Sequence, residues 1–342
     1  MPGPTLATND AIDSFDDEAT RRNTSRRYKL PPMKSNRGVS IIVLVSVVLI
    51  VACGKDAGKR SSAPSPDSSL TSAASRPVSR NTGWDEAAAG NFIVLAASDD
   101  MIDAALVLPQ ETDSSLSNAG TPALSFFANK SVDLFDAAGA AGTSALAINP
   151  QQQPNEGCVV WPSVRLTAKP AKSWKVGFES GRATSIPMDS IGGMSSADSS
   201  SITIELARVA SAATIGGDPA FQGLPFTVRK AYRMQLGDTA VLIGSVVRKI
   251  NEEANPREEH LLLVAERSGT AGKYLLGFQS RSAGAEDVIR TNTVLAALRF
   301  VRTKRPAIVF SFEYDDGGQV ALLQRLSDHD WKISWRSAYT GC

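Results

Sequence analysis

The sequence has very little histidine and cysteine, the residue types that most often supply metal ligands, general bases and nucleophiles. Only two histidines and three cysteines occur among 342 residues. Neither histidine lies in an H-x-E or HExxH pattern, and the sequence contains no CxxC pair and no G-x-S-x-G stretch. The common zinc motifs and the nucleophile elbow of serine hydrolases are therefore excluded. We expect neither a metal nor any other cofactor.

An excess of charge of either sign is also lacking. The chain has 36 Lys and Arg residues against 35 Asp and Glu residues, a formal net charge of +1. Binding to nucleic acid by electrostatics requires a strongly basic surface, so we expect no nucleic-acid partner. The one basic cluster contains Arg299, Arg302, Lys304 and Arg305. We interpret this cluster as the solvated end of a strand.

A run of apolar residues long enough to cross a bilayer is missing as well. Residues 39–53, VSIIVLVSVVLIVAC, carry no charge and follow the basic residues Lys34 and Arg37. A helix of this length rises about 22 Å, which is short of the roughly 30 Å hydrocarbon core of a membrane. The run has the size of the apolar region of a signal peptide.

The end of this run, IVAC at residues 50–53, resembles the lipobox of bacterial lipoproteins. In that family the cysteine receives a diacylglyceryl group and signal peptidase II cuts before it. The resemblance covers residues 33–54 only. It implies that Cys53 is the lipidated mature N-terminus and that the protein is held by lipid in the bacterial envelope. Gly54, and not an aspartate, follows Cys53. The resemblance therefore also implies that the protein is released to the outer membrane, where it faces the periplasm or the surface.

The segments around the apolar run also fit this organisation. A start at Met33 gives a compact signal peptide over 33–52, so the polar residues 1–32 are either disordered or the product of a wrong start codon. The competing interpretation is a single-pass anchor whose basic residues between 21 and 37 stay in the cytoplasm. Residues 53–82 are rich in Ser and Pro and read as a tether to the folded part.

Residues 83–342 are long enough for one large domain, or for two subdomains at 83–215 and 219–342. The expected fold class is α+β, mostly β, with antiparallel meander sheets and one clear helix over 196–213. Ser195 and Asp198 fit a capping box at the start of that helix, and apolar residues repeat along it at helical spacing.

Short apolar or alternating runs predict the strands. In the first half they are 91–97, 104–109, 123–128, 132–135, 144–148, 159–166 and 174–179. In the second half they are 226–234, 240–250, 259–266, 274–280, 293–302, 307–314, 320–325 and 331–335. The run 293–302 also fits a helix, because Val294, Ala297, Leu298 and Val301 share a helical face.

Cys158 and Cys342 remain as an even pair if Cys53 carries lipid. In an oxidising compartment this number predicts one disulfide bond. The bond would close a loop of about 185 residues and contribute on the order of 5 kcal/mol by a chain-entropy model. The alternative is two unrelated buried thiols.

The densest polar segment, residues 251–259, is interpreted as a loop between two apolar strands. Its carboxylates Glu252, Glu253, Glu258 and Glu259 could bind a cation or a partner. The alternative is a soluble hairpin tip whose charges prevent aggregation.

The histidines and tryptophans are interpreted as structural. His260 stands at the start of a predicted strand, and His329 lies between two aspartates in a predicted turn. The tryptophans fall mostly at strand positions and fit a core better than a sugar-stacking platform. They are Trp84, Trp161, Trp174, Trp331 and Trp335.

Two functional hypotheses follow. The first is a lipid-anchored envelope protein with a non-catalytic binding or structural domain, whose partner is an envelope protein or a glycan. The second is a periplasmic hydrolase of glycan or peptide that uses carboxylates such as Asp99, Asp189 or Glu253. The second hypothesis requires two carboxylates about 5 to 9 Å apart in one pocket. The lack of a catalytic motif favours the first hypothesis.

Overall fold

The computed structural model describes residues 83–97, 101–109, 121–148, 159–213, 217–251, 256–270, 272–285 and 288–341. These residues belong to one compact unit, Leu70–Cys342. The fold is mostly β, with antiparallel sheets and one long helix, as the sequence predicts. Among the described residues no helix is both long and apolar enough to span a bilayer.

The first part of the unit is a closed six-stranded barrel that follows a short helix, α1 (Glu86–Ala89). Its strands are β1 (Ile93–Ala96), β2 (Asp103–Val107), β3 (Ser131–Asp136), β4 (Gly139–Ile148), β5 (Ser163–Leu166) and β6 (Val176–Glu179), joined in the order β1-β2-β5-β4-β3-β6. Pairing of β1 with β6 closes the barrel. A Cβ on Gly177 of β6 would lie 2.7 Å from Val94 and 2.9 Å from Leu134, so glycine lets side chains from both neighbouring strands fill this point.

The remaining strands form two antiparallel sheets. The central sheet has the order β16-β15-β14-β13-β7, with β17 paired to β15, and the outer sheet has the order β12-β11-β10-β9-β8. The strands of the central sheet are β7 (Ala183–Ser185), β13 (Thr291–Phe300), β14 (Pro306–Tyr314), β15 (Gly317–Ser327), β16 (Asp330–Arg336) and β17 (Thr340–Gly341). Those of the outer sheet are β8 (Asp189–Ser190), β9 (Thr227–Leu236), β10 (Thr239–Ile250), β11 (Arg257–Ser268) and β12 (Leu275–Ala285).

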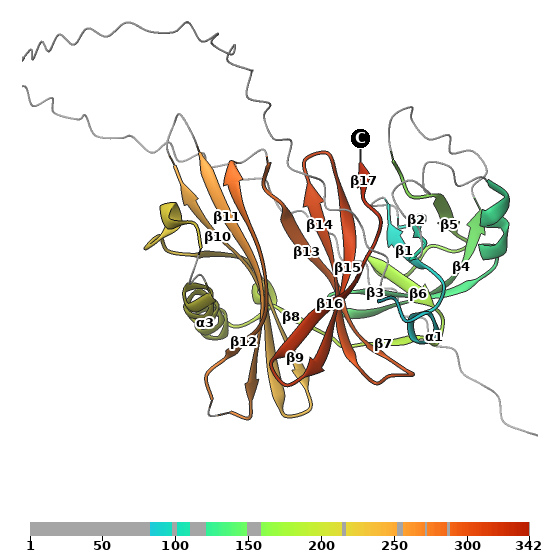
Figure 1. The fold of residues 1–342 in the computed structure, drawn as a ribbon. Coiled ribbons are helices and arrows are strands. Elements are labelled where there is room, and N and C mark those ends of the chain that lie inside the picture. The colour runs from blue at the N-terminus through green and yellow to red at the C-terminus, as the bar shows by residue number, and fades with distance from the viewer. Residues whose placement is uncertain are drawn as a thin grey trace, which may run out of the picture. The chain divides into compact units, whose positions relative to one another are not determined.

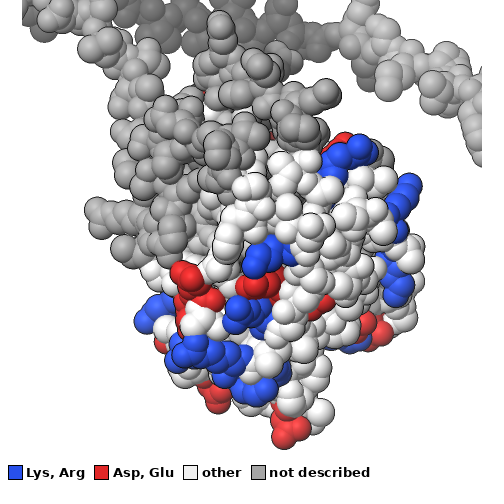
Figure 2. Space-filling model, turned by 90° about the vertical axis from the view of Figure 1, so that its right-hand side faces the viewer, with Lys and Arg blue, Asp and Glu red and all other residues white. Residues whose placement is uncertain are grey.

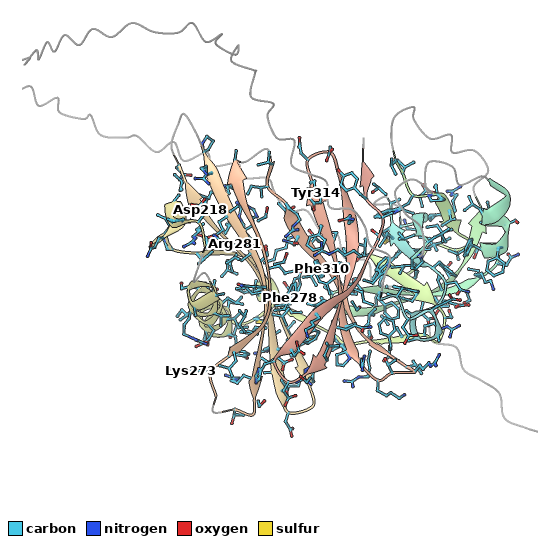
Figure 3. All side chains as sticks on the ribbon, in the orientation of Figure 1. Asp218, Lys273, Phe278, Arg281, Phe310 and Tyr314 are labelled. Atoms are coloured by element: carbon cyan, nitrogen blue, oxygen red, sulfur yellow. The ribbon has the colours of Figure 1, made fainter. Side chains whose placement is uncertain are left out.

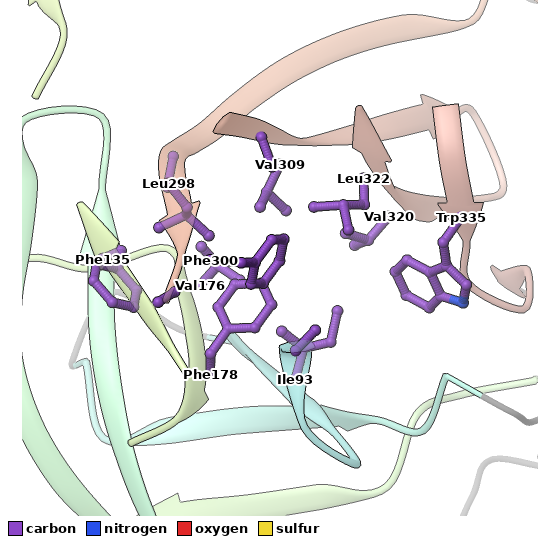
Figure 4. Close-up of a cluster of buried hydrophobic side chains, with 14 of the residues drawn as sticks. Ile93, Phe135, Val176, Phe178, Leu298, Phe300, Val309, Val320, Leu322 and Trp335 are labelled. Atoms are coloured by element: carbon purple, nitrogen blue, oxygen red, sulfur yellow. The ribbon is translucent and has the colours of Figure 1, made fainter. Parts of the chain in front are cut away.

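The central sheet lies between the barrel and the outer sheet (Figure 1). On its barrel side, Phe300 of β13 packs against Phe178 of β6 with ring centres 5.8 Å apart, within the apolar cluster of Figure 4. On its other side, Phe310 of β14 faces Phe278 of β12 at 6.4 Å, as Figure 3 shows. Apolar side chains on both faces explain why the central strands read as nearly continuous hydrophobic runs.

Helix α3 (Ser196–Ala213) covers the second face of the outer sheet and has the predicted bounds. The Ser195 hydroxyl accepts the Asp198 backbone N–H at 3.1 Å and donates to the Asp198 carboxylate at 2.9 Å, so the predicted cap is formed. Leu206 packs over Gly244 of β10, where a Cβ would come within 2.6 Å of the leucine side chain. The layers are therefore helix, outer sheet, central sheet and barrel.

One predicted strand needs correction, two alternatives can be compared with the structure, and some elements were not predicted. The run 123–128 is not a strand but part of a 3-10 helix, η1 (Thr121–Phe127); Pro122 has no N–H for a strand ladder and suits the first turn of a helix. The run 293–302 is strand β13 and not a helix. A boundary near 215–219 would separate α3 from the sheet on which it packs. The short strands β7 and β8 and the closure of the barrel are not predicted.

The surface and the tryptophans agree with the sequence analysis. Basic and acidic side chains lie intermixed on the face shown in Figure 2. Buried tryptophans belong to the apolar clusters, and Trp161 packs against one of them while half-buried. The buried ones are Trp84, Trp174, Trp331 and Trp335.

Candidate functional site

Buried polar residues gather where β10 ends and β11 begins, at the end of the sheets drawn at the top of Figure 1. Successive residues of a strand point to opposite faces of a sheet. Leu261 and Leu263 of β11 pack in the cluster under α3, whereas Leu262 and Val264 pack in the cluster against the central sheet. Glu259 therefore faces the helix side, and Glu258 and His260 face the central sheet.

On the helix side, Glu259 is fully buried and forms ion pairs with Arg248 of β10 and Arg281 of β12. Arg248 is also buried, and its guanidinium lies 4.7 Å from the ring centre of Phe226 and 5.7 Å from that of Phe221. The two arginines compensate the charge of the buried carboxylate. This network joins three strands of the outer sheet.

Asp218 extends the network toward the chain that follows α3. Its side chain accepts the Ala220 backbone N–H at 2.9 Å and pairs with Arg257 at 2.6 Å. The hydrogen bond from Ala220, aided by Arg257 and Arg281, lowers the pKa of Asp218 below its ordinary value. Asp218 and Arg281 lie at the same end of the outer sheet (Figure 3). Gly217 lies directly against the Arg281 guanidinium, so a side chain there would displace it.

On the side of the central sheet, Glu258 contacts both Lys249 and the His260 ring, whose Nε2 lies 2.5 Å from a Glu258 oxygen. Burial, together with the positive charges of Arg229 and Lys249, lowers the pKa of His260. The imidazole is therefore neutral at pH 7 and is bonded to a residue of its own strand.

These contacts revise the acidic loop predicted over 251–259. Strand β11 begins at Arg257, so Glu258 and Glu259 are strand residues that are 7% and 0% exposed. Their carboxylates are held by cations of the same sheet and are not presented to solvent. The physical reason is the register of β10 and β11, which places Lys249 opposite Glu258 and Arg248 opposite Glu259.

Several predicted site residues lie outside the described residues, namely Cys53, Asp99, Cys158, Glu252, Glu253 and Cys342. Of the carboxylates suggested for a hydrolase, the structure describes Asp189. It lies in β8, its side chain is 67% exposed, and it pairs with Arg233 at 3.3 Å. In the described part of the chain no group of three or more His, Cys, Asp or Glu side chains could hold a metal ion.

A second cluster of residues lies on the face of the central sheet that packs against the outer sheet. It lies at the end of the sheets where β10 ends and β11 begins. Asn292 of β13, Phe312 of β14 and Gln319 of β15 are direct neighbours in the strand register. We call these three residues the polar floor. Asn292 is 8% exposed and Gln319 is 1% exposed. The Gln319 amide donates to the Ser337 carbonyl at 3.0 Å. Asn292 Oδ1 and Gln319 Oε1, both buried, have no hydrogen-bond partner among the described residues.

Two arginines lie over the ring of the polar floor. The guanidinium carbon of Arg290 is 4.4 Å from the Phe312 ring centre and that of Arg336 is 4.7 Å from it. Arg290 donates to the Ser280 hydroxyl at 2.9 Å, while its buried Nε has no partner among the described residues. Burial and the nearby charge of Arg290 lower the pKa of Arg336. Two like charges are thus held close together.

The opposite end of the two sheets holds Glu266 of β11, which is fully buried. It accepts hydrogen bonds from Arg325 at 2.6 and 2.8 Å, from the His329 backbone N–H at 2.9 Å and from the Trp331 indole at 2.6 Å. Burial alone would raise the pKa of Glu266, but these hydrogen bonds outweigh it and lower the pKa. All its partners belong to the β15–β16 hairpin.

The sequence analysis did not find the polar floor or the two arginines above it. A signal was present, because Asn292 and Gln319 are polar residues at inward-facing positions of otherwise apolar strands. A comparison with protein-family models, curated protein sequences and solved structures finds no match to this chain. The functional argument therefore depends on this geometry and on the residues at the N-terminus.

Proposed function

We propose that the chain is a lipid-anchored protein of the bacterial cell envelope whose folded unit is a non-catalytic binding module. The resemblance of residues 50–53 to a lipobox supports the anchor, and the Ser- and Pro-rich residues 54–82 suit a tether. The near-neutral charge favours a partner recognised by specific polar contacts and not by a broad electrostatic surface.

The observation that carries the binding function is the polar floor. A buried donor or acceptor without a partner costs about 1–3 kcal/mol, and native proteins contain few such groups. Here Asn292, Gln319 and Arg290 each have one such atom at the same end of the sheets. A bound molecule that completes these hydrogen bonds accounts for polar residues at positions where the strands otherwise bury apolar ones.

The ionisation of the described acids supports binding over hydrolysis. A carboxylic acid that donates a proton near neutral pH needs a raised pKa. Contacts lower the pKa of both Asp218 and Glu266, so these side chains stay ionised. Glu258 forms an ion pair with Lys249, and Glu259 forms ion pairs with Arg248 and Arg281.

The anchor is tested by expressing the full-length chain in bacteria with labelled palmitate. We expect the wild-type protein to take up the label and to be shortened at Cys53. A Cys53→Ala variant should remain unlabelled and leave the membrane fraction. A wild-type protein that never takes the label and stays at full length in the membrane would favour the single-pass anchor.

Binding is tested by the melting temperature of the purified full-length chain in a small-molecule extract of bacterial envelopes. We expect the extract to raise the melting temperature of the wild type, because a ligand that binds only the folded state stabilises it. An Asn292→Leu variant should not respond. The control is Arg299→Gln, which changes a partly exposed arginine that donates to the Lys304 carbonyl. An extract that affects neither the wild type nor the control contradicts the binding function.

A further inference from the structure

We propose that the polar floor, with Arg290 and Arg336, binds a small carboxylate that also carries a hydroxyl or amino group. This inference rests on the proposed binding function and specifies the chemistry of its ligand. It depends on three properties of the site: two cations, two buried acceptors, and an aromatic ring between them.

The two cations select an anionic group. Arg290 and Arg336 lie at similar distances from the ring of Phe312, and each presents a guanidinium group at this end of the sheets. Guanidinium groups present paired N–H donors that match the two oxygens of a carboxylate. Arg290 Nε is a buried donor that still lacks an acceptor among the described residues, which is the pairing that a carboxylate supplies.

The two acceptors require that the ligand carries a hydrogen-bond donor in addition to its carboxylate. Asn292 Oδ1 and Gln319 Oε1 are carbonyl-type oxygens, and they accept hydrogen bonds only. The Gln319 assignment is fixed by its amide nitrogen, which donates to the Ser337 carbonyl. A simple carboxylate without an O–H or N–H group would leave both oxygens unpaired. An amino acid, whose ammonium group has three N–H donors, would pair both oxygens, whereas a hydroxy acid, with a single O–H, would pair one of them.

The ring between them suits a small carbon skeleton. Phe312 is fully buried in the strand register between Asn292 and Gln319. Two residues further along β14, Tyr314 lies on the same face and is partly exposed, at the upper end of the sheet in Figure 3. The side chains thus pass from a buried apolar ring to a half-exposed rim of tyrosine and arginine. This gradient fits a ligand whose polar groups bind at defined points around a short apolar part.

The test is calorimetric titration of the full-length chain with glycolate, L-serine, acetate and inorganic phosphate. We expect glycolate or L-serine to bind and acetate to bind at least about tenfold more weakly, because a site that hydrogen-bonds a hydroxyl rejects the analogue lacking it. The affinity for inorganic phosphate distinguishes a site that binds any anion from one that is specific for carboxylates.

Variants connect the binding to these residues. Arg290→Gln should weaken glycolate or L-serine at least about tenfold, because it removes a charge-assisted contact. Asn292→Leu should abolish the preference over acetate while leaving the melting temperature unchanged or higher, since a buried amide oxygen without a partner is replaced by an apolar group of similar size. Arg299→Gln, the control, should bind as the wild type does.

The inference is overturned if none of the four probes binds, if acetate binds as tightly as glycolate and L-serine, or if phosphate binds more tightly than all three. It is also overturned if binding persists unchanged in Arg290→Gln. In these cases the envelope extract decides the wider question. If the extract still stabilises the wild type and not Asn292→Leu, the binding function stands with a different ligand. If it stabilises neither, both proposals are wrong.

Discussion

Buried polar side chains at the two ends of the sheets differ in how fully they are hydrogen-bonded. Glu266 receives hydrogen bonds from a side chain, a backbone N–H and an indole of one hairpin, so its charge is well compensated. Asn292 and Gln319 are buried at the other end of the same pair of sheets with acceptors left unpaired. The first arrangement stabilises the fold by itself. The second would be completed by the ligand that we propose above.

We predict that Glu266→Gln destabilises the folded unit by about 1.5–3 kcal/mol, because a partly buried guanidinium loses a charge-assisted pair and keeps only its exposed partner Asp328. Arg325 is the cation that would remain. The measurement is urea unfolding of the full-length chain. The matched control is Glu205→Gln, which breaks a partly exposed pair with Arg208 on α3 and should cost less than about 1 kcal/mol. Equal losses for the two variants would contradict the buried role of Glu266.

The lowered pKa of Glu266 also predicts an acid dependence. Because the folded state holds this carboxylate ionised, the unfolded state binds the proton more readily, and stability rises with pH in this range. The contribution is fully present above the ordinary glutamate pKa of about 4.3 and is lost as the pH falls below it toward the folded-state pKa. Melting temperatures measured from pH 7 down to acid should fall less steeply in Glu266→Gln than in the wild type below that pH.

At the level of elements, the second half of the chain is well predicted from sequence. Each run between 226 and 335 forms a strand close to the expected bounds, because hairpins pair neighbours in the chain and turn residues mark their ends. The barrel is harder to predict from the sequence. Its closure pairs β1 with β6 across some eighty residues of chain, and no local pattern encodes that pairing. Strands β7 and β8 are too short to show a period.

The site is less predictable than the fold. Sequence reasoning identified Glu258 and Glu259 as notable but placed them in a loop, because charged residues at a strand end look like a hairpin tip. Their burial depends on cations of β10 and β12 that only the pairing register brings close. Asn292 and Gln319 are single polar residues in apolar strands, and nothing nearby in the sequence marks them as neighbours of each other.

The packing of α3 predicts a compensating pair of substitutions. Gly244→Val should destabilise the protein by about 1–3 kcal/mol, because the new side chain overlaps Leu206. Adding Leu206→Ala should recover part of that loss in a double-mutant cycle. Gly192→Val, at a position with open space around the added carbon, is the control. Additive losses in the double variant would show that the contact is not the cause.

The backbone around β17 sharpens the prediction of a disulfide. Val159 and Gly341 exchange two backbone hydrogen bonds, of 2.9 and 2.8 Å, in an antiparallel bridge. In the sequence Cys158 directly precedes Val159 and Cys342 directly follows Gly341, so the predicted disulfide would join the residues next to this bridge.

Mass spectrometry of the oxidised chain without reductant should find a peptide that joins Cys158 to Cys342. Replacing either cysteine with serine should lower the unfolding free energy by about 2–5 kcal/mol in oxidising buffer. Under reducing conditions the same replacement should have much less effect. Quantitative alkylation of both thiols in oxidised protein would rule the bond out.

At the level of the whole molecule, the central sheet couples the other layers. Its two faces contribute to two separate apolar clusters, one with the barrel and one with the outer sheet. A change on one face should therefore reach both neighbours through the shared strands β13 to β15.

We predict that Phe300→Ala, on the barrel side, costs about 3–5 kcal/mol. Hydrogen exchange should accelerate in β10 and β11 as well as in β3 and β6, because the sheet that supports both is weakened. Phe126→Ala, at an exposed aromatic of η1, is the control and should leave both regions unchanged. Faster exchange confined to the barrel strands would mean that the layers open independently.

The order of the layers along the chain has a consequence for the newly made protein. The barrel is complete at Glu179, but the strands that cover its apolar outer side begin at Thr291. Phe135 and Phe178 therefore lack this cover for more than a hundred residues of synthesis, until Phe300 and its sheet have been made. Exposed apolar surface of this kind favours aggregation. Until the strands from Thr291 onward have been made, binding of a chaperone or fast synthesis of these strands should increase the fraction of molecules that reach the native state.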